Sequence, residues 1–200
     1  MRKLATIALT LLISHIWAQT NEIDETCKEY DDKIALAEAE EMPELVPYLK
    51  ISCTLIKRAI GPVDHLVTIY FDEHEIEIGQ PGQDVFHKEA VIRKATFSIS
   101  AVSYNIHYSY YFNEGGILIK YVERQVGYGC RIIENYFGEK GVIRMKQQPL
   151  EADCEESDID AETFDKTELT KEEKASASWI LDDANKFRDI LFNNYELIKN

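Results

Sequence analysis

The sequence predicts an α+β fold in which an N-terminal helix and a C-terminal helix flank an antiparallel sheet of six to seven strands. Three observations predict it: an apolar stripe of helical period near the start, a long central region rich in β-branched and aromatic residues with glycine turns, and a second helical stripe at the end. With 200 residues, of which 45% are hydrophobic, the chain is large enough to form one domain around its own core.

Residues 1–18 have the layout of a secretory signal peptide. Arg2 and Lys3 provide the positive start, an apolar run of about ten residues follows, and Ala18 is the small residue after which we expect cleavage. Because a helix that spans a bilayer needs about 20 apolar residues, we expect no stable membrane insertion, and an uncleaved anchor is the less favoured alternative. The mature protein is therefore expected in the periplasm or outside the cell.

Residues 19–150 are expected to form a helix followed by the sheet. The helix is predicted over residues 22–41, before Pro43, by an apolar stripe with intervals of four and three, made of Ile23, Cys27, Tyr30, Ile34 and Ala37. Short glycine turns favour a meander of antiparallel neighbours. Its strands are predicted at 51–60, 66–71, 90–102, 104–112, 117–123, 131–137 and 142–146.

The C-terminal part begins with a strongly acidic segment. Residues 151–174 hold 11 acidic and 3 basic residues, and we expect 151–170 to be a solvated linker. Thr170 and Glu173 then form a capping box, which predicts a last helix over about 171–197 within the segment 171–200. We expect this helix to belong to the same domain and to cover the same face of the sheet as the first helix.

Four cysteines follow the signal peptide, which is an even number in an oxidising compartment and indicates two disulfides. Three pairings are compatible with the sequence. We favour Cys27–Cys53 and Cys130–Cys154, because each pair closes a short loop within one half of the chain. A redox or metal site is the weaker alternative, since the sequence has no C-x-x-C and no cysteine near a histidine.

Tyrosine is abundant in the predicted sheet, and an amphipathic ring of this kind suits a binding surface. In the segment 104–112, alternation places Tyr108 and Tyr110 on one side of the strand and Asn105, His107 and Tyr111 on the other. Tyr111 is the tyrosine we least expect to be buried. We therefore take Tyr111, His107 and Asn105 as the candidate binding surface, while burial of the tyrosines in the core is the alternative.

Other functional classes find little support in the sequence. A formal net charge of −14 argues against nucleic acid as a partner. The chain has no nucleophile elbow, phosphate-binding loop or zinc-type ligand spacing, so we expect no catalytic residues, no metal and no cofactor. An α+β hydrolase or isomerase is one alternative, and it requires His107 in a closed pocket with Glu123 or Glu134.

A weak calcium site is the second alternative. Asp158, Asp160 and Glu162 alternate along the acidic segment, but an EF-hand loop that starts at Asp158 would need a glycine and a glutamate where Thr163 and Leu169 stand. Solvated charge is the favoured interpretation of this segment.

A short motif recurs three times as an aromatic pair followed two residues later by Glu: Tyr70-Phe71-Asp72-Glu73, Tyr111-Phe112-Asn113-Glu114 and Tyr136-Phe137-Gly138-Glu139. The last two copies continue into glycine and an apolar pair, which predicts a hairpin in each. These hairpins resemble those of small exported bacterial proteins of unknown function and, distantly, MORN-type repeats, although their spacings of 41 and 25 residues are irregular. The resemblance implies a fold element and no activity.

Taken with the export signal, these patterns predict an exported binding protein without catalysis. Its expected partner is another protein or a cell-envelope component, which it would meet through the tyrosine-rich sheet or the loops of that sheet.

Overall fold

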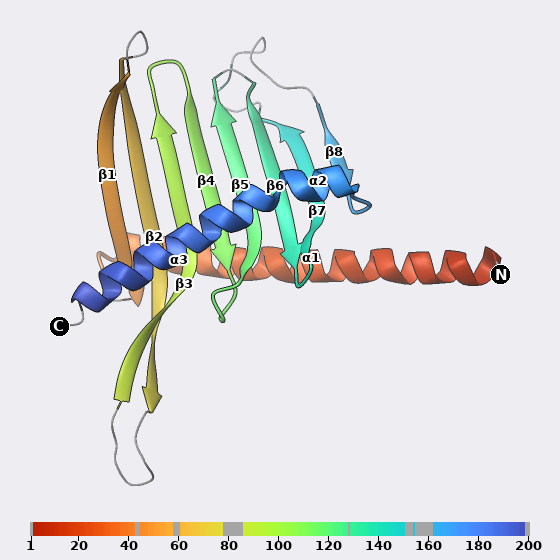
Figure 1. The fold of residues 1–200 in the computed structure, drawn as a ribbon, viewed down its shortest axis with the longest axis horizontal. Coiled ribbons are helices and arrows are strands. Elements are labelled where there is room, and N and C mark those ends of the chain that lie inside the picture. Colours follow the sequence, from red (N-terminus) through yellow and green to blue (C-terminus); the bar gives the residue numbers. More distant parts are fainter. Residues whose placement is uncertain are drawn as a thin grey trace.

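The computed structural model describes residues 2–42, 45–57, 61–77, 86–127, 129–150, 154 and 162–198, with side chains described from Ser14 onward except at 76–77, 86–87 and 196–198. Eight strands form one antiparallel sheet in chain order (Figure 1). They are β1 (Tyr48–Lys57), β2 (Gly61–Glu77), β3 (Phe86–Ser100), β4 (Asn105–Phe112), β5 (Leu118–Val126), β6 (Arg131–Gly138), β7 (Gly141–Pro149) and β8 (Phe164–Lys166). The helices are α1 (Arg2–Ala39), α2 (Lys171–Ser176) and α3 (Ser178–Ile198). The predicted α+β meander is confirmed.

Several bounds differ from the sequence-based expectation: α1 begins at Arg2 and not at residue 22, β2 covers Gly61–Glu77 and not 66–71, and the C-terminal part differs in two places. Strand β8 lies within 151–170, which was expected to be linker only, and Arg144 holds it against β7 through both oxygens of Asp165 at 2.8 and 2.7 Å. The predicted last helix is divided in two at Ala177, although the capping box of Thr170 and Glu173 forms as expected. The remainder of the acidic segment, except Cys154, lies outside the described residues up to position 161.

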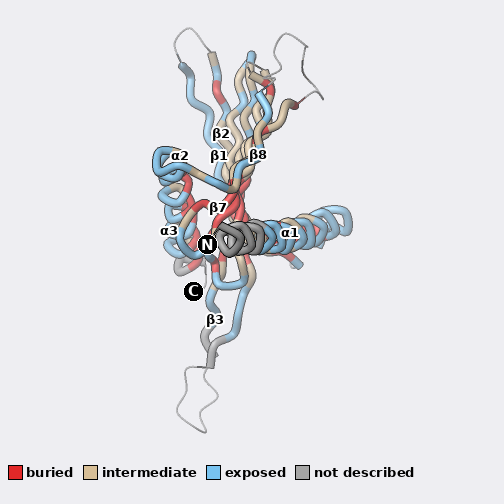
Figure 2. The backbone as a smooth tube through the Cα atoms, turned by 90° about the vertical axis from the view of Figure 1, so that its right-hand side faces the viewer, coloured by how far each residue is buried: buried red, intermediate tan, exposed pale blue. Residues whose placement is uncertain are grey.

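The two long helices lie on opposite faces of the sheet, which corrects the expectation that both cover one face (Figure 2). Strand β4 shows why. Neighbouring residues of a strand point to opposite faces, and here both Tyr110 and Tyr111 are buried because Tyr110 packs on the α3 side and Tyr111 on the α1 side. A sheet whose middle is covered on both faces needs apolar or aromatic residues at consecutive positions, and the aromatic pairs provide them.

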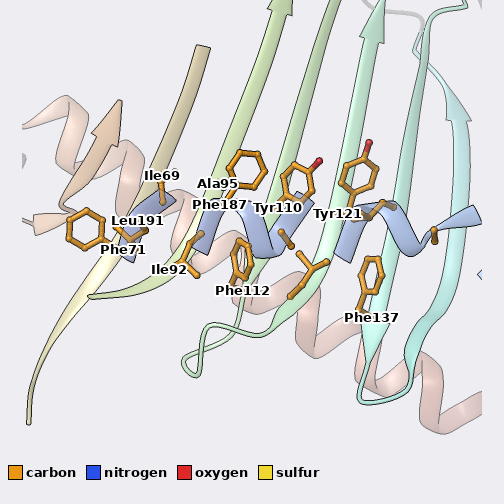
Figure 3. Close-up of a cluster of buried hydrophobic side chains, with 14 of the residues drawn as sticks. Ile69, Phe71, Ile92, Ala95, Tyr110, Phe112, Tyr121, Phe137, Phe187 and Leu191 are labelled. Atoms are coloured by element: carbon orange, nitrogen blue, oxygen red, sulfur yellow. The ribbon is translucent and has the colours of Figure 1, made fainter. Parts of the chain in front are cut away.

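The larger core lies between α3 and the sheet (Figure 3). The apolar stripe of α3 is buried as predicted and packs with aromatic and aliphatic side chains from six strands, β2 to β7. Its helical members are Ile180, Ala184, Phe187, Leu191 and Tyr195. The ring of Phe187 packs edge-on against Tyr110 with the ring centres 5.0 Å apart, a favoured geometry for aromatic pairs.

The three copies of the aromatic motif coincide with three irregularities in the sheet. The register shifts between Tyr70 and Phe71, between Tyr111 and Phe112, and between Tyr136 and Phe137. At each place the partner strand has one extra residue, as in a β-bulge, which bends the strand and increases its twist. In every copy the tyrosine faces α1, and the phenylalanine faces α3. The repeat is therefore a device for placing one ring on each face of the sheet.

The cysteines confirm one predicted disulfide and contradict the other. Cys130 and Cys154 are bonded, whereas Cys27 and Cys53 are both free. Cys27 is buried on the side of α1 that faces the sheet, where it packs with Tyr111. Cys53 is exposed on β1 and, by strand alternation, points to the α3 side together with Leu49. The predicted Cys27–Cys53 bridge is wrong because the sheet lies between the two thiols.

Candidate binding surface

The three residues expected to form the binding surface differ in their solvent exposure. Tyr111 is only 9% exposed, and its hydroxyl donates a hydrogen bond to Asp31 of α1 at 2.8 Å, so it is not available to a partner. His107 and Asn105 are exposed, as expected, on the α1-side face of β4. The expectation that Tyr111 is the least buried tyrosine is therefore wrong, because α1 covers the part of this face on which Tyr111 lies.

His107 does not meet the carboxylates that the hydrolase alternative requires. It shares a hydrogen bond of 2.7 Å with Ser98, and its pKa is lowered because partial burial and the nearby Lys94 and Arg124 cations disfavour the charged ring. Glu123 lies elsewhere, where it accepts a hydrogen bond of 2.9 Å from the Tyr121 hydroxyl.

Glu134 is also engaged away from His107. It forms ion pairs with Lys120 at 2.7 Å and with Lys146 at 3.0 Å. The closed histidine–carboxylate pocket is not formed, and His107 lies on an open face.

Beneath α1, the sheet carries a row of alternating tyrosines and cations, which we call the Tyr–cation row. Its members are directly opposite one another on successive strands from β2 to β7: Tyr70, Lys94, Tyr111, Lys120, Tyr136 and Arg144. The ammonium groups lie over rings, with 4.9 Å from Lys94 to Tyr111 and 4.8 Å from Lys120 to Tyr136. Cations over aromatic faces are attracted by the ring quadrupole, more strongly where water is excluded.

Helix α1 contacts this row through acids seven residues apart. Asp31 accepts a hydrogen bond from Lys94 at 2.5 Å, and Asp24 accepts one from Lys120 at 2.6 Å. Seven helical residues rise about 10.5 Å, whereas two strands span about 9.6 Å, so one heptad of α1 matches one hairpin of the sheet. The heptad spacing of the acidic residues on α1 therefore matches the spacing of the lysines and tyrosines on the sheet, and α1 packs on the sheet through these contacts.

A third contact between α1 and the row lies another seven residues toward the N-terminus, at Trp17. This residue is seven positions before Asp24, and its ring lies 3.9 Å from the Arg144 guanidinium. Arg144 also donates a hydrogen bond to the buried Thr20 hydroxyl at 3.0 Å. Trp17 belongs to the predicted signal peptide and Thr20 to the predicted mature chain, and α1 is one continuous helix through both. Cleavage after Ala18 stays a prediction.

The opposite face has a different character. A ladder of rings crosses it from β2 to α3, in the order His65, Phe97, Tyr108, Tyr121 and Trp179. The centres of successive rings are 5.8, 5.7, 6.2 and 5.5 Å apart, and the first three pairs are stacked. Each ring in such a ladder packs against its neighbours in one of the favoured aromatic geometries.

Helix α3 covers only part of this face, and the strands continue beyond it (Figure 1). The uncovered part, which we call the open apolar face, consists of side chains that are half-buried or exposed and that alternation places on the α3 side: Ile51, Leu55, Phe97, Ile99, Ile106 and Tyr108. Leu55 is 48% exposed and Ile51 is 42% exposed. Contiguous apolar surface of this kind marks interaction sites more often than an isolated exposed leucine does.

The sequence predicted the exposure of Asn105 and His107 on the tyrosine-rich strand, but the exposure expected for Tyr111 is wrong. Alternation in 104–112 placed Tyr108 and Tyr111 on opposite faces correctly. The predicted strand at 51–60 also contained the apolar residues Ile51 and Leu55, which could have indicated the open apolar face. What the strand pattern could not show is which half of each face a helix would cover.

No family model matches the chain, and no curated protein and no solved structure matches it either. Among the described residues, no group of histidine, cysteine and carboxylate side chains is placed to hold a metal ion, and Asp158 and Asp160 lie outside them. In the same part of the chain, none of the helices is both long and apolar enough to cross a bilayer.

Proposed function

We propose that this protein is an exported binding protein without catalysis, and that it binds another protein through the open apolar face. The observation that carries the proposal is the ring ladder, which starts at Trp179 of α3 and buried Tyr121 and continues onto uncovered surface at Tyr108 and Phe97. Rigid aromatic side chains supply large contact area at low conformational entropy cost, which is why they dominate protein–protein interfaces.

The packing of the ladder supports this use of the face. Phe97 and Tyr108 pack against the α3-side core at one end and remain partly accessible at the other. A partner would therefore meet side chains whose rotamers are already restricted, and preorganisation of this kind reduces the ordering cost of association. The edge strand β1 extends the surface with Ile51 and Leu55.

Charge narrows the class of partner. The chain has 36 acidic and 22 basic residues, and its net charge of −14 opposes association with another strongly acidic protein. We therefore take the partner to be a basic protein with an apolar contact surface, and its association rate should fall as salt rises.

Export is supported by two independent features. The leader at 1–18 has the pattern of a secretory signal, and the Cys130–Cys154 disulfide is typical of an oxidising compartment. The partner is accordingly expected in the periplasm, in the cell envelope or outside the cell.

Site-specific photo-crosslinking tests the proposal with a matched control on one strand. A benzophenone amino acid replaces either Ile106, on the open apolar face, or Asn105, which is the adjacent residue and points to the opposite face. We expect the label at position 106 to yield an adduct with one basic protein in the producing cells, and the label at position 105 to yield none. Adducts from position 105 alone, equal adducts from both, or none from position 106 would contradict the proposal.

A further inference from the structure

Helix α1 and the sheet use one arrangement twice. In it, a lysine ammonium lies between a carboxylate of the helix and the ring of a tyrosine. Lys120 is bonded to Asp24 at 2.6 Å and lies 4.8 Å from the centre of the Tyr136 ring, whose hydroxyl also donates to Asp24. The chain itself thus demonstrates which chemical group a carboxylate and a tyrosine bind when they are held together in this geometry.

The second copy repeats these contacts one heptad further along α1. Lys94 is bonded to Asp31 at 2.5 Å and lies 4.9 Å from the centre of the Tyr111 ring, whose hydroxyl donates to Asp31 at 2.8 Å. In both copies the lysine comes from the strand that precedes the tyrosine in the sheet, directly opposite it.

A third copy of the carboxylate and the tyrosine is present another seven residues on. Glu38 and Tyr70 line the same cavity, and burial together with the Glu38 charge raises the pKa of Tyr70. Here the preceding strand places Tyr48 opposite Tyr70, at the position that holds lysine in the other two copies. The two rings are 5.9 Å apart and tilted by 49°, so they form two walls of a corner.

This corner is a cavity of about 330 Å³, and its described lining includes no basic residue. Its apolar floor is formed by Ile34, Ala37 and Val46, which are all buried. Two carboxylates, those of Glu38 and Glu41, stand at its border. An apolar floor, aromatic walls and negative charge are the features with which proteins recognise alkylated ammonium groups.

Glu41 provides an observation that is independent of the repeat. Helix α1 ends in a Schellman motif, in which the Met42 amide bonds to the Ala37 carbonyl at 2.9 Å and the Glu41 amide to the Glu38 carbonyl at 3.4 Å. Glu41 has φ 54°, a left-handed conformation for which helix ends normally use glycine. Among the described residues it is the one non-glycine with positive φ, and this strained position places a carboxylate at the cavity.

We propose that the cavity between the end of α1 and the Tyr48–Tyr70 corner binds an alkylammonium group, which takes the place that Lys94 and Lys120 take in the other two copies. The aliphatic stem lies on the apolar floor, and the ammonium contacts Glu38, Glu41 and the two rings. The group has two sources, a free alkylamine or a lysine side chain on a polypeptide, and the shared chemistry is a primary ammonium on a short hydrocarbon chain.

Binding is measured by isothermal titration of the full-length protein with n-butylammonium, with N-acetyl-lysine methylamide, and with n-butanol as the uncharged analogue. We expect saturable binding of at least one of the two cations and at least tenfold weaker binding of butanol. Preference for the lysine derivative assigns the site to a polypeptide ligand, and preference for butylammonium assigns it to a free amine. Equal binding of butanol, or no binding of either cation, would overturn the proposal.

Three variants distinguish an effect on cation affinity from an effect on the stability of the fold. Tyr48→Ala removes an exposed ring, and we expect it to weaken cation binding at least fivefold without affecting folding. Glu41→Gly relieves the left-handed strain, so we expect a higher melting temperature together with at least threefold weaker binding. Glu40→Gln, at the adjacent exposed position outside the cavity lining, is the charge-matched control and should change neither. If Glu41→Gly raises the melting temperature but leaves the affinity unchanged, Glu41 has no part in the site and the proposal in this form fails.

Discussion

Replacing Lys120 by methionine tests how α1 is held on the sheet. Lys120 is 8% exposed, and its ammonium contacts Asp24 of α1 and Glu134 of β6 at 2.6 and 2.7 Å. Methionine keeps most of the aliphatic volume but removes the charge. Breaking a buried pair by deleting one partner costs about 3 to 5 kcal/mol. Glu134 keeps Lys146, and Asp24 has a side chain that is 42% exposed, so we expect a loss of about 2 to 3 kcal/mol of unfolding free energy.

The pH dependence follows from the two shifted groups. Burial alone would lower the pKa of Lys120, but Glu134 and Asp24 more than offset it, and the pKa is raised. Burial alone would raise the pKa of Glu134, but Lys120 and Lys146 hold it below its usual range. The Glu134 contribution is therefore lost as pH falls below about 4.5, and the Lys120 contribution is lost as pH rises above about 10.4. The difference between wild type and Lys120→Met should be largest between these limits and should shrink on both sides.

Urea unfolding at 25 °C, repeated across this pH range, measures the difference. Lys28→Met is the matched control, because Lys28 and its partner Asp32 have side chains that are 76% and 65% exposed, and such pairs contribute less than about 1 kcal/mol. A Lys120→Met loss no larger than that of Lys28→Met, or a difference that does not change at low pH, would refute the reasoning.

Three further predictions concern the cysteines and the last helices. Thr170→Ala removes the hydroxyl oxygen that accepts the capping hydrogen bond from the Glu173 amide, so amide exchange in α2 should indicate a helix destabilised by about 1 kcal/mol. The double variant Cys130→Ala/Cys154→Ala opens a link with a sequence separation of 24 and should lose about 3.5 kcal/mol of unfolding free energy in urea, whereas an unchanged value would contradict the role of the disulfide. Iodoacetamide should modify exposed Cys53 in the native protein but modify Cys27 only after unfolding, because burial raises the pKa of the Cys27 thiol to about 12; mass spectrometry of the labelled peptides distinguishes the two.

Sequence periodicity predicted which side of a single helix or strand is buried. It did not predict which face of the sheet each helix covers. The stripe through Ile23 and Cys27 is buried as expected, and the alternation of β4 separates its two faces correctly. Neither pattern states which face a helix covers, and both the burial of Tyr111 and the separation of Cys27 from Cys53 depend on that choice.

The Tyr–cation row was not predicted either, because it also depends on how separate elements are placed relative to one another. Its members come from six strands, and their alignment can be derived only from the register, which shifts at the bulge opposite each aromatic pair. The sequence signal was nevertheless present, because Asp24, Asp31 and Glu38 are spaced by seven on a helix whose apolar stripe was recognised. Strand β8 was missed because three residues in an acidic segment have no recognisable period.

The central claim is that the open apolar face is the surface that a partner contacts. The most direct measurement is the affinity of the crosslinked partner, once purified, for two variants at adjacent positions of β3: Phe97→Ser on that face and Ser98→Ala on the other. We predict that Phe97→Ser weakens binding more than tenfold, as loss of an aromatic anchor does, while Ser98→Ala leaves it unchanged and both variants keep a cooperative thermal transition. Unchanged affinity for Phe97→Ser, or a larger loss for Ser98→Ala, would contradict the claim.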